Sequence, residues 1–184
     1  GFVMNIKIHN YAEVTIGGGK RRYYNQMLGG LNDRLLSNED ITAYIAFGSG
    51  NRQSLSGVTS LALQRGVIKA ELCAKNFDAG KGVIFIKKMI ELGGEYDGVS
   101  IKEIAFTPNA DGSGIINYIV CDEQKQEGES LIIAMALYIT YSFSGGALCG
   151  GENPLFELLL GEKDFSKTEI SAVFSDGAAC GGKR

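Results

Sequence analysis

The chain of 184 residues has the composition of a globular protein, with 45% hydrophobic and 21% charged residues. Its length predicts one domain, or one domain with an extension, that can bury a core without help from metals or disulfides. The formal net charge of −3 argues against a sequence-independent nucleic-acid binder, which needs clustered Lys and Arg to displace counterions.

The N-terminal part of the chain predicts an extended segment followed by a helix. Residues 5–16 alternate polar and apolar side chains as a strand or pair of strands does, and His9 falls among the exposed polar positions. A glycine turn follows, and its Gly17–Lys20 sequence lacks the spacing of a phosphate-binding loop and has Arg21 where that loop needs Ser or Thr. From residue 20 to 36 the apolar residues recur at helical spacing, at Tyr24, Met27, Leu28, Leu31 and Leu35. This spacing predicts the chain's one long amphipathic helix, with the basic run 20–22 as its solvated start and Tyr23 off the apolar stripe.

The middle of the chain predicts strands and hairpins. Residues 41–47 predict a strand, whereas residues 55–63 fit a short helix or an irregular crossing equally well. The segments 66–75 and 81–92 predict one hairpin. Two runs rich in β-branched residues, on either side of a Pro, Asn, Asp and Gly loop, predict a second hairpin over 101–121. In its first strand, Ile101, Glu103 and Ala105 should share one face and Ile104 and Phe106 the other. The apolar run 131–141 predicts a core strand.

The amino-acid composition changes after residue 144, where pairs of glycines indicate a domain boundary and the start of an extension over 145–184. Residues 154–161 predict a short helix with proline in its first turn and glycine after its end. Residues 170–174 predict a last strand, and a glycine-rich tail follows. Five large apolar side chains on the short helix need a cover, which makes them the predicted partner contacts together with Tyr23: Leu155, Phe156, Leu158, Leu159 and Leu160.

Cysteine usage and hydropathy predict a protein made in the cytoplasm. The four cysteines, Cys73, Cys121, Cys149 and Cys180, contain no C-x-x-C pair, and the chain has a single histidine, so zinc-site spacing is absent. The N-terminus has no signal-peptide pattern. The longest apolar run, residues 131–139, is about half the length of a membrane-spanning helix. We therefore expect neither a membrane partner nor a nucleic-acid partner.

No pattern in the sequence predicts catalytic, cofactor-binding or metal-binding residues. Asn109, Asp111 and Ser113 imitate the first half of an EF-hand loop, but the closing carboxylate would fall at Val120. The acidic pairs at 39–40 and 122–123 are candidates for general acid and base, yet adjacent residues on a strand or turn point in different directions. We predict a protein without enzymatic activity and without cofactors.

Several of these segments together resemble a layout common in phage tail-fibre and collar-fibre attachment domains. The strand 41–47 ends in a Gly48–Ser49–Gly50 turn, Leu63 and Arg65 follow, a later strand carries Ala70 and Glu71, and the Ile101–Phe106 strand enters a hairpin. The resemblance covers about residues 41–143; Ala105 stands where that family usually has glycine. It implies a non-enzymatic virion component on a tail, a collar or a capsid surface, often a homo-oligomer.

These observations together predict a mainly β (α+β) protein. Residues 1–144 should form an antiparallel β-sandwich with one longer amphipathic helix near the N-terminus, and residues 145–184 the extension. The predicted function is a virion structural and assembly module that binds itself, as a trimer, and other virion proteins. The alternative is a module that binds host-surface carbohydrate through the aromatic faces of Tyr23, Tyr96 or Tyr118.

Overall fold

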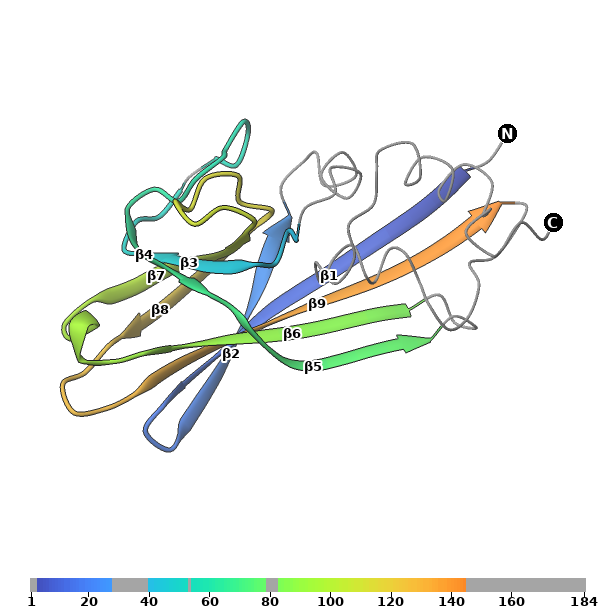
Figure 1. Ribbon diagram of the computed structural model, residues 1–184. Helices are drawn as coiled ribbons and strands as arrows, with labels where there is room; N and C mark the ends of the chain where they lie inside the picture. The colour runs from blue at the N-terminus through green and yellow to red at the C-terminus, as the bar shows by residue number, and fades with distance from the viewer. Residues whose placement is uncertain (1–2, 28–39, 53, 79–82, 145–184) are drawn as a thin grey trace.

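The computed structural model of the chain describes residues 3–27, 40–52, 54–78 and 83–144, which form nine strands and one short 3₁₀ helix (Figure 1). In chain order these elements are β1 (Val3–Ile16), β2 (Gly19–Met27), β3 (Tyr44–Gly48), β4 (Gln64–Lys69), β5 (Glu71–Asp78), β6 (Val83–Leu92), η1 (Gly94–Tyr96), β7 (Ser100–Thr107), β8 (Asn117–Gln124) and β9 (Leu131–Ser144). The prediction of a mainly β protein is confirmed.

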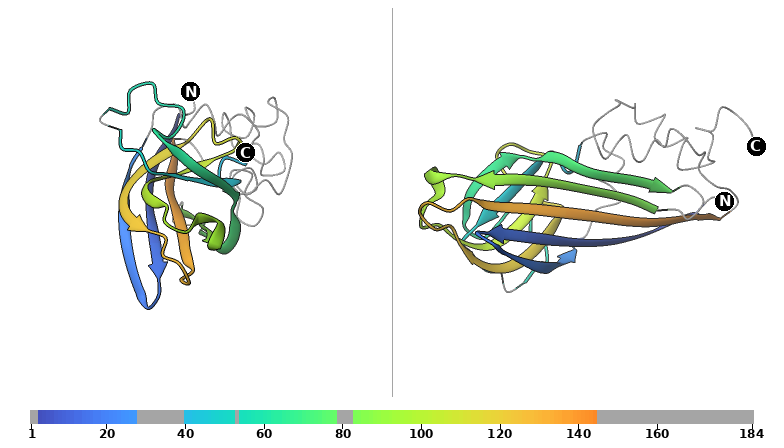
Figure 2. Two further views of the ribbon diagram at one scale, coloured as in Figure 1. Left: turned by 90° about the vertical axis from the view of Figure 1, so that its left-hand side faces the viewer. Right: turned by 90° about the horizontal axis from the view of Figure 1, so that it is seen from below.

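All neighbouring strands are antiparallel, in the order β4-β3-β7-β8-β2-β1-β9-β6-β5. The ladder divides into two sheets. The large sheet contains β2, β1, β9, β6 and β5, and the small sheet contains β4, β3, β7, β8 and the last residues of β2. The two sheets lie over one another, and the long strands of the large sheet extend well beyond the small sheet (Figures 1 and 2).

Two segments pass from one sheet to the other. Residues 20–24 of β2 pair with β1, and residues 25–27 pair with β8. The ends of the ladder, β4 and β5, are joined through the single residue Ala70, whose N–H donates to Ala43 O. The chain therefore turns the corner between the sheets at both sides, and a strand that changes sheet in this way holds the two sheets in register.

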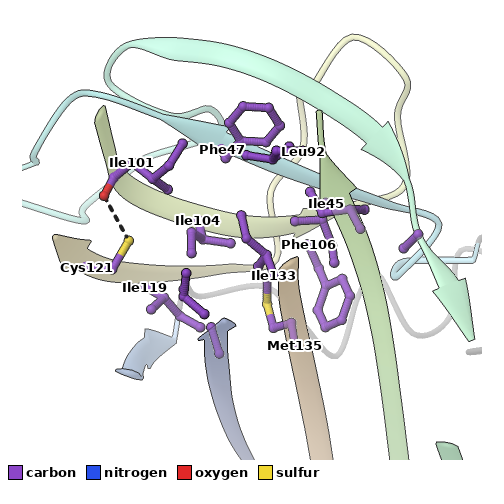
Figure 3. Close-up of a cluster of buried hydrophobic side chains, with 14 of the residues drawn as sticks. Ile45, Phe47, Leu92, Ile101, Ile104, Phe106, Ile119, Cys121, Ile133 and Met135 are labelled. Atoms are coloured by element: carbon purple, nitrogen blue, oxygen red, sulfur yellow. Dashed lines mark hydrogen bonds between the residues drawn. The ribbon is translucent and has the colours of Figure 1, made fainter. Parts of the chain in front are cut away.

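The core lies between the sheets, where apolar side chains from both inner faces meet (Figure 3). The small sheet contributes Ile45, Phe47, Ile104, Phe106 and Ile119, and the large sheet contributes Ile86, Leu92, Ile133, Met135 and Leu137, all of which are fully buried. Alternation along each strand explains this division, since every second residue faces inward. The apolar run from residue 131 to 137 is only partly buried on its second face, where Ile132 and Ala134 are half-buried.

Buried polar groups link the two sheets across this core. The Asn117 side-chain amide donates to Asn10 Oδ1 at 2.6 Å, and Asn10 Nδ2 donates to the main-chain oxygen of Ala136 at 2.9 Å. Asn117 Oδ1 accepts from the Phe106 N–H at 2.7 Å. Each amide is thus satisfied by a partner that exists only when the sheets are correctly aligned, which favours one register over a slipped one.

The predicted helix over 20–36 is wrong where the structure describes it, because residues 19–27 form strand β2. Gly17, with φ of +57°, and Gly18 make a tight turn that pairs Ile16 with Gly19, so the chain reverses into a hairpin. The helical stripe fails as well, since Tyr24 on the stripe is 71% exposed while Tyr23 off the stripe packs on the core. The remaining residues, 28–36, lie outside the described part of the chain.

The predicted hairpin over 101–121 is confirmed as β7–β8. The hairpin predicted from the segments 66–75 and 81–92 is confirmed only in part, because its first strand is divided at Ala70: residues 64–69 form β4, which pairs with β3, and β5 alone pairs with β6. One detail is wrong: Ile101 does not share a face with Glu103. A β-bulge between these two residues turns Ile101 into the core, beside Ile104 and Phe106. Residues 54–63 contain neither a strand nor a helix in the structure. The predicted extension over 145–184, with its short helix and last strand, lies outside the described residues and stays a prediction.

Candidate functional site

The outer face of the small sheet is covered by the protein's own loops. Ala46, Ala105 and Tyr118 on this face form a second apolar cluster with Leu61 and Ile115, which come from the β3–β4 and β7–β8 connections. Leu55, Val58 and Val67 pack against the same cluster. This face is therefore a third layer of the domain, and it is closed to a partner wherever these loops lie.

A buried carboxylate holds the β3–β4 loop in place. Glu103 is fully buried, and its Oε1 accepts from the N–H of Ala62 and the hydroxyl of Tyr118, both at 2.7 Å. Its Oε2 accepts from the N–H of Leu63 at 2.8 Å and that of Gly50 at 2.9 Å. A Cβ at Gly50 would stand 2.8 Å from this oxygen and 2.5 Å from Ala62 Cβ, so glycine is required there. The arrangement organises a loop, and no open space adjoins the carboxylate for a substrate.

The outer face of the large sheet is different, because none of the described loops covers it. Antiparallel partners share a face, and the register places Tyr11 beside Tyr24 and Ala136, and Glu13 beside Arg22 and Ala134. Tyr24 is 71% exposed and Tyr138 38% exposed. The Tyr138 ring packs edge-on against Phe85, with 6.4 Å between centroids. We call this surface the open face.

A cluster of four charges lies at the centre of the open face. Glu13 is almost fully buried under cations, with Arg22 Nη2 at 3.0 Å and both Lys20 Nζ and Lys87 Nζ at 3.1 Å from its oxygens. The Arg22 guanidinium also lies 4.1 Å from the centroid of the Tyr11 ring, a cation–π contact. Three cations around one carboxylate leave this part of the face with an excess of two positive charges.

Burial by itself would raise the pKa of Glu13, but hydrogen bonds from Lys87 and Lys20, the charge of Lys87 and a hydrogen bond from Arg22 lower the pKa from 4.5 to about 2. Because the folded-state pKa is depressed, the ionised cluster stabilises the fold fully above pH 4.5 and loses that contribution as pH falls towards 2. We expect Glu13→Gln to lower the free energy of unfolding by about 1–2 kcal/mol at pH 7, after allowance for the exposed cations. Urea denaturation of both proteins at pH 7 and pH 3 measures this, and the difference should shrink at pH 3.

The sequence-predicted site residues do not come together. Tyr23 is half-buried and lies at the junction of β2 and β8, where its hydroxyl donates to Glu123 Oε1 at 2.7 Å. The five apolar residues predicted as partner contacts, from Leu155 to Leu160, lie outside the described residues. The tyrosines named for carbohydrate binding are poorly placed, since Tyr118 is buried and Tyr96 is half-buried against Phe47, with 5.0 Å between ring centroids. His9 is exposed on β1, as predicted.

The EF-hand-like loop is closed by its own side chains. Asp111 Oδ1 accepts from the N–H of Ser113 at 2.9 Å and from its hydroxyl at 2.6 Å, and Asn109 Nδ2 donates to the Ser113 carbonyl at 3.0 Å. These bonds lower the pKa of Asp111 and make a compact turn. In the part of the chain that the structure describes, no group of three His, Cys, Asp or Glu side chains is arranged to hold a metal ion.

One of the cysteines, Cys121, lies in the core between the sheets. Burial above all, and then the charges of Glu123 and Asp122, raise the pKa of the Cys121 thiol to about 12, so this thiol is unreactive at neutral pH. Among the described residues there is no helix with the length and apolar character needed to cross a membrane.

Comparison of the chain with protein-family models, with curated proteins and with solved structures found no match.

The open face was not predicted from the sequence. The alternation of β1 contained a signal for it, because Tyr11, Glu13 and Thr15 occupy the positions opposite to Ala12 and Val14. The cations that surround Glu13 come from β2 and β6, and only the strand register shows that they meet.

Proposed function

We propose that this chain is a non-enzymatic structural and assembly module with a β-sandwich fold, of the kind that virion attachment proteins use, and that it binds a second copy of itself through the open face. One observation carries this proposal. The protein covers the outer face of its small sheet with its own loops, while the open face leaves Tyr24 and Tyr138 in solvent beside a cationic cluster. Aromatic residues and Arg are enriched at protein–protein contacts.

The size of the open face fits such a contact. Five strands spaced about 4.8 Å apart and up to 14 residues long span roughly 20 Å by 40 Å, or about 800 Å². Stable interfaces of ordinary size bury about 800 Å² on each partner. The open face alone can therefore supply one side of a specific interface.

The charge of the open face favours a ring over a two-fold dimer. In a two-fold contact the same patch meets itself, which would bring two cationic clusters together. A head-to-tail contact instead sets the cluster of one copy against a different, acidic surface of the next. The β6–β7 and β8–β9 loops provide such a surface, with Glu95, Asp97 and Glu129 near the buried cation Lys125. Head-to-tail contacts that close give rings, such as the trimer predicted from the sequence.

The test is the solution mass of the chain, measured by light scattering across a dilution series at low and high salt. We expect a trimer that dissociates more readily at high salt, because the contact pairs opposite charges. The double substitution Tyr24→Ser and Tyr138→Ser should shift the protein to a folded monomer, with the far-UV circular dichroism spectrum of the wild type. Leu63→Ser is the matched control, since Leu63 is 53% exposed but lies in a loop away from the open face.

A monomer at every concentration would contradict self-assembly through this face. A trimer that survives the double substitution and is lost with Leu158→Ser and Leu159→Ser would place the contact in the predicted C-terminal segment instead. The carbohydrate alternative would then rest on Tyr24, the most exposed large hydrophobic residue of the described chain. Binding of the monomer to a glycan array, lost on Tyr24→Ser, would support that alternative.

A further inference from the structure

The sheets separate at the junction between β2 and β8. These strands pair only at Asn25–Ile119, Gln26–Tyr118 and Met27–Asn117. Beyond that point β2 follows β1 into the hairpin, while β8 continues along β7 to Gln124. The edge of β8 over residues 120–124 and the facing edge of β2 over residues 19–24 therefore have no strand partner among the described residues. An unpaired edge offers main-chain N–H and C=O groups to another strand.

The space between these two edges is a cleft of about 400 Å³. Its apolar floor is Val14 and Ile16, from the inner face of β1. Its walls are polar and come from both strands and the β8–β9 loop: Gly19, Arg21, Asp122, Glu123, Gln124 and Gln126. An extended peptide placed along β8 would turn alternate side chains towards this floor and towards solvent.

Tyr23 reaches across the cleft at its inner end. Its hydroxyl donates to Glu123 Oε1 and lies 3.2 Å from the main-chain oxygen of Asp122. Burial, followed by the bond to the Glu123 carboxylate, raises the pKa of Tyr23, so the hydroxyl stays protonated at neutral pH. The Tyr23 hydroxyl thus donates to a main-chain oxygen at the third residue of the unpaired edge of β8, as the N–H of a neighbouring strand would. Arg21 of β2 also reaches across to Glu123, with 3.6 Å between Nε and Oε1, so both side chains would have to turn aside for an added strand.

The charges at the open end of the cleft select among peptides. From residue 122 to 129 the chain has the carboxylates Asp122, Glu123, Glu127 and Glu129 and one lysine. That lysine, Lys125, is buried and bonded to Asp97 at 2.6 Å, so it does not neutralise this rim. The Asp122 side chain is 84% exposed but pairs with Lys102 Nζ at 3.1 Å, and Glu123 Oε1 lies 3.6 Å from Arg21 Nε. The exposed Glu127 and Glu129 keep this rim acidic, and a basic residue on the solvent side of an added strand would meet them.

We propose that this cleft binds an extended segment of a partner protein by strand addition to the free edge of β8, and that the segment alternates apolar with polar residues and includes Lys or Arg. Main-chain hydrogen bonds provide the affinity in this mode of recognition, and the pockets for alternate side chains provide specificity. The cleft lies apart from the open face, so this proposal does not rest on self-assembly.

The test uses two glycines of the β1–β2 turn. Gly19 lines the cleft, and a Cβ there meets only Ile16 O at 3.7 Å, so Gly19→Trp should fill the cleft without disturbing the hairpin. Gly18 is next to it, does not line the cleft, and a Cβ there meets nothing within 4 Å. Gly18→Trp is therefore the matched control, and the melting temperatures of both variants should equal that of the wild type.

The probe is a displayed library of random seven-residue peptides selected on the wild-type chain. We expect enrichment of alternating sequences with Lys or Arg, whose synthetic versions bind Gly19→Trp at least about tenfold more weakly, and Gly18→Trp unchanged, because a filled cleft removes several main-chain bonds. A peptide of the same sequence with N-methyl groups on alternate amides should also bind the wild type weakly, since it cannot pair along a strand. Either no enrichment, or peptides that tolerate N-methylation, would overturn the proposal; a cleft-dependent glycan on an array would reassign the site to sugars.

Discussion

Glu103→Leu should lower the free energy of unfolding by about 4 kcal/mol, the largest effect of any single substitution that we expect here. The leucine fills a similar volume but accepts no hydrogen bond. Three main-chain N–H groups, of Gly50, Ala62 and Leu63, would lose their acceptor and face the leucine side chain instead, and a donor left without a partner costs about 1–3 kcal/mol where water cannot reach it. The loss should appear in urea denaturation, with a further loss of order in the β3–β4 loop measured by amide hydrogen exchange.

Tyr118→Phe is the control for this prediction. It removes one of the four donors to Glu103 and the acceptor of the Arg52 N–H, and it leaves the three main-chain bonds to Glu103 in place, so it should cost about 1–2 kcal/mol. If Glu103→Leu were no more destabilising than Tyr118→Phe, the loop would be held by the packing of Leu61 and Ile115 and not by the carboxylate.

The sequence predicts the strands well because most of them obey local rules. Residues 100–124 form the predicted hairpin, since β-branched runs and a loop of Pro, Asn, Asp and Gly favour it whatever the rest of the chain does. The same holds for β6, whereas the predicted strand 66–75 divides at Ala70 into β4 and β5, which lie in different sheets. Burial of Glu103, by contrast, has no local signal, because its main-chain partners lie 40 to 53 residues away along the chain and Tyr118 lies 15 residues away.

The failure over residues 20–27 has a clear physical cause. A helix and a strand both place some apolar residues at matching positions in so short a segment, and tertiary pairing decides between them. Here β1 offers a full edge, and the Gly17–Gly18 turn brings residues 19–24 onto it in register. The bulge at Ile101 is similar. One extra residue in a strand moves a side chain to the other face of the sheet, and the alternation of polar and apolar residues in the sequence does not show where this happens. The open face and the cleft both depend on register, so neither could be found before the pairing was known.

Asp40→Asn should lower the free energy of unfolding by about 2 kcal/mol, because it leaves the buried cation of Lys88 without its counter-charge. Lys88 projects from β6 into the core, and its Nζ lies 3.1 Å from Asp40 Oδ2 and 3.0 Å from Thr42 O. The pair joins the large sheet to the segment that enters β3. Its side chains are 6% and 24% exposed, so water compensates part of the loss. Asparagine can keep the Oδ1 bond to the Thr42 N–H, so the substitution removes the charge of residue 40 and leaves its hydrogen bond within the turn in place.

A double-mutant cycle separates this ion pair from simple packing. Lys88→Met replaces the buried cation with an apolar side chain of similar length, so by itself it should cost less than about 1 kcal/mol, since exchange of a buried ion pair for apolar contact is often neutral. Adding Asp40→Asn to Lys88→Met should then cost almost nothing, which gives a coupling of about 2 kcal/mol between the two residues. If the two losses were simply additive, Asp40 would act through its turn alone, and the two sheets would be held at this end by the apolar core without electrostatic help.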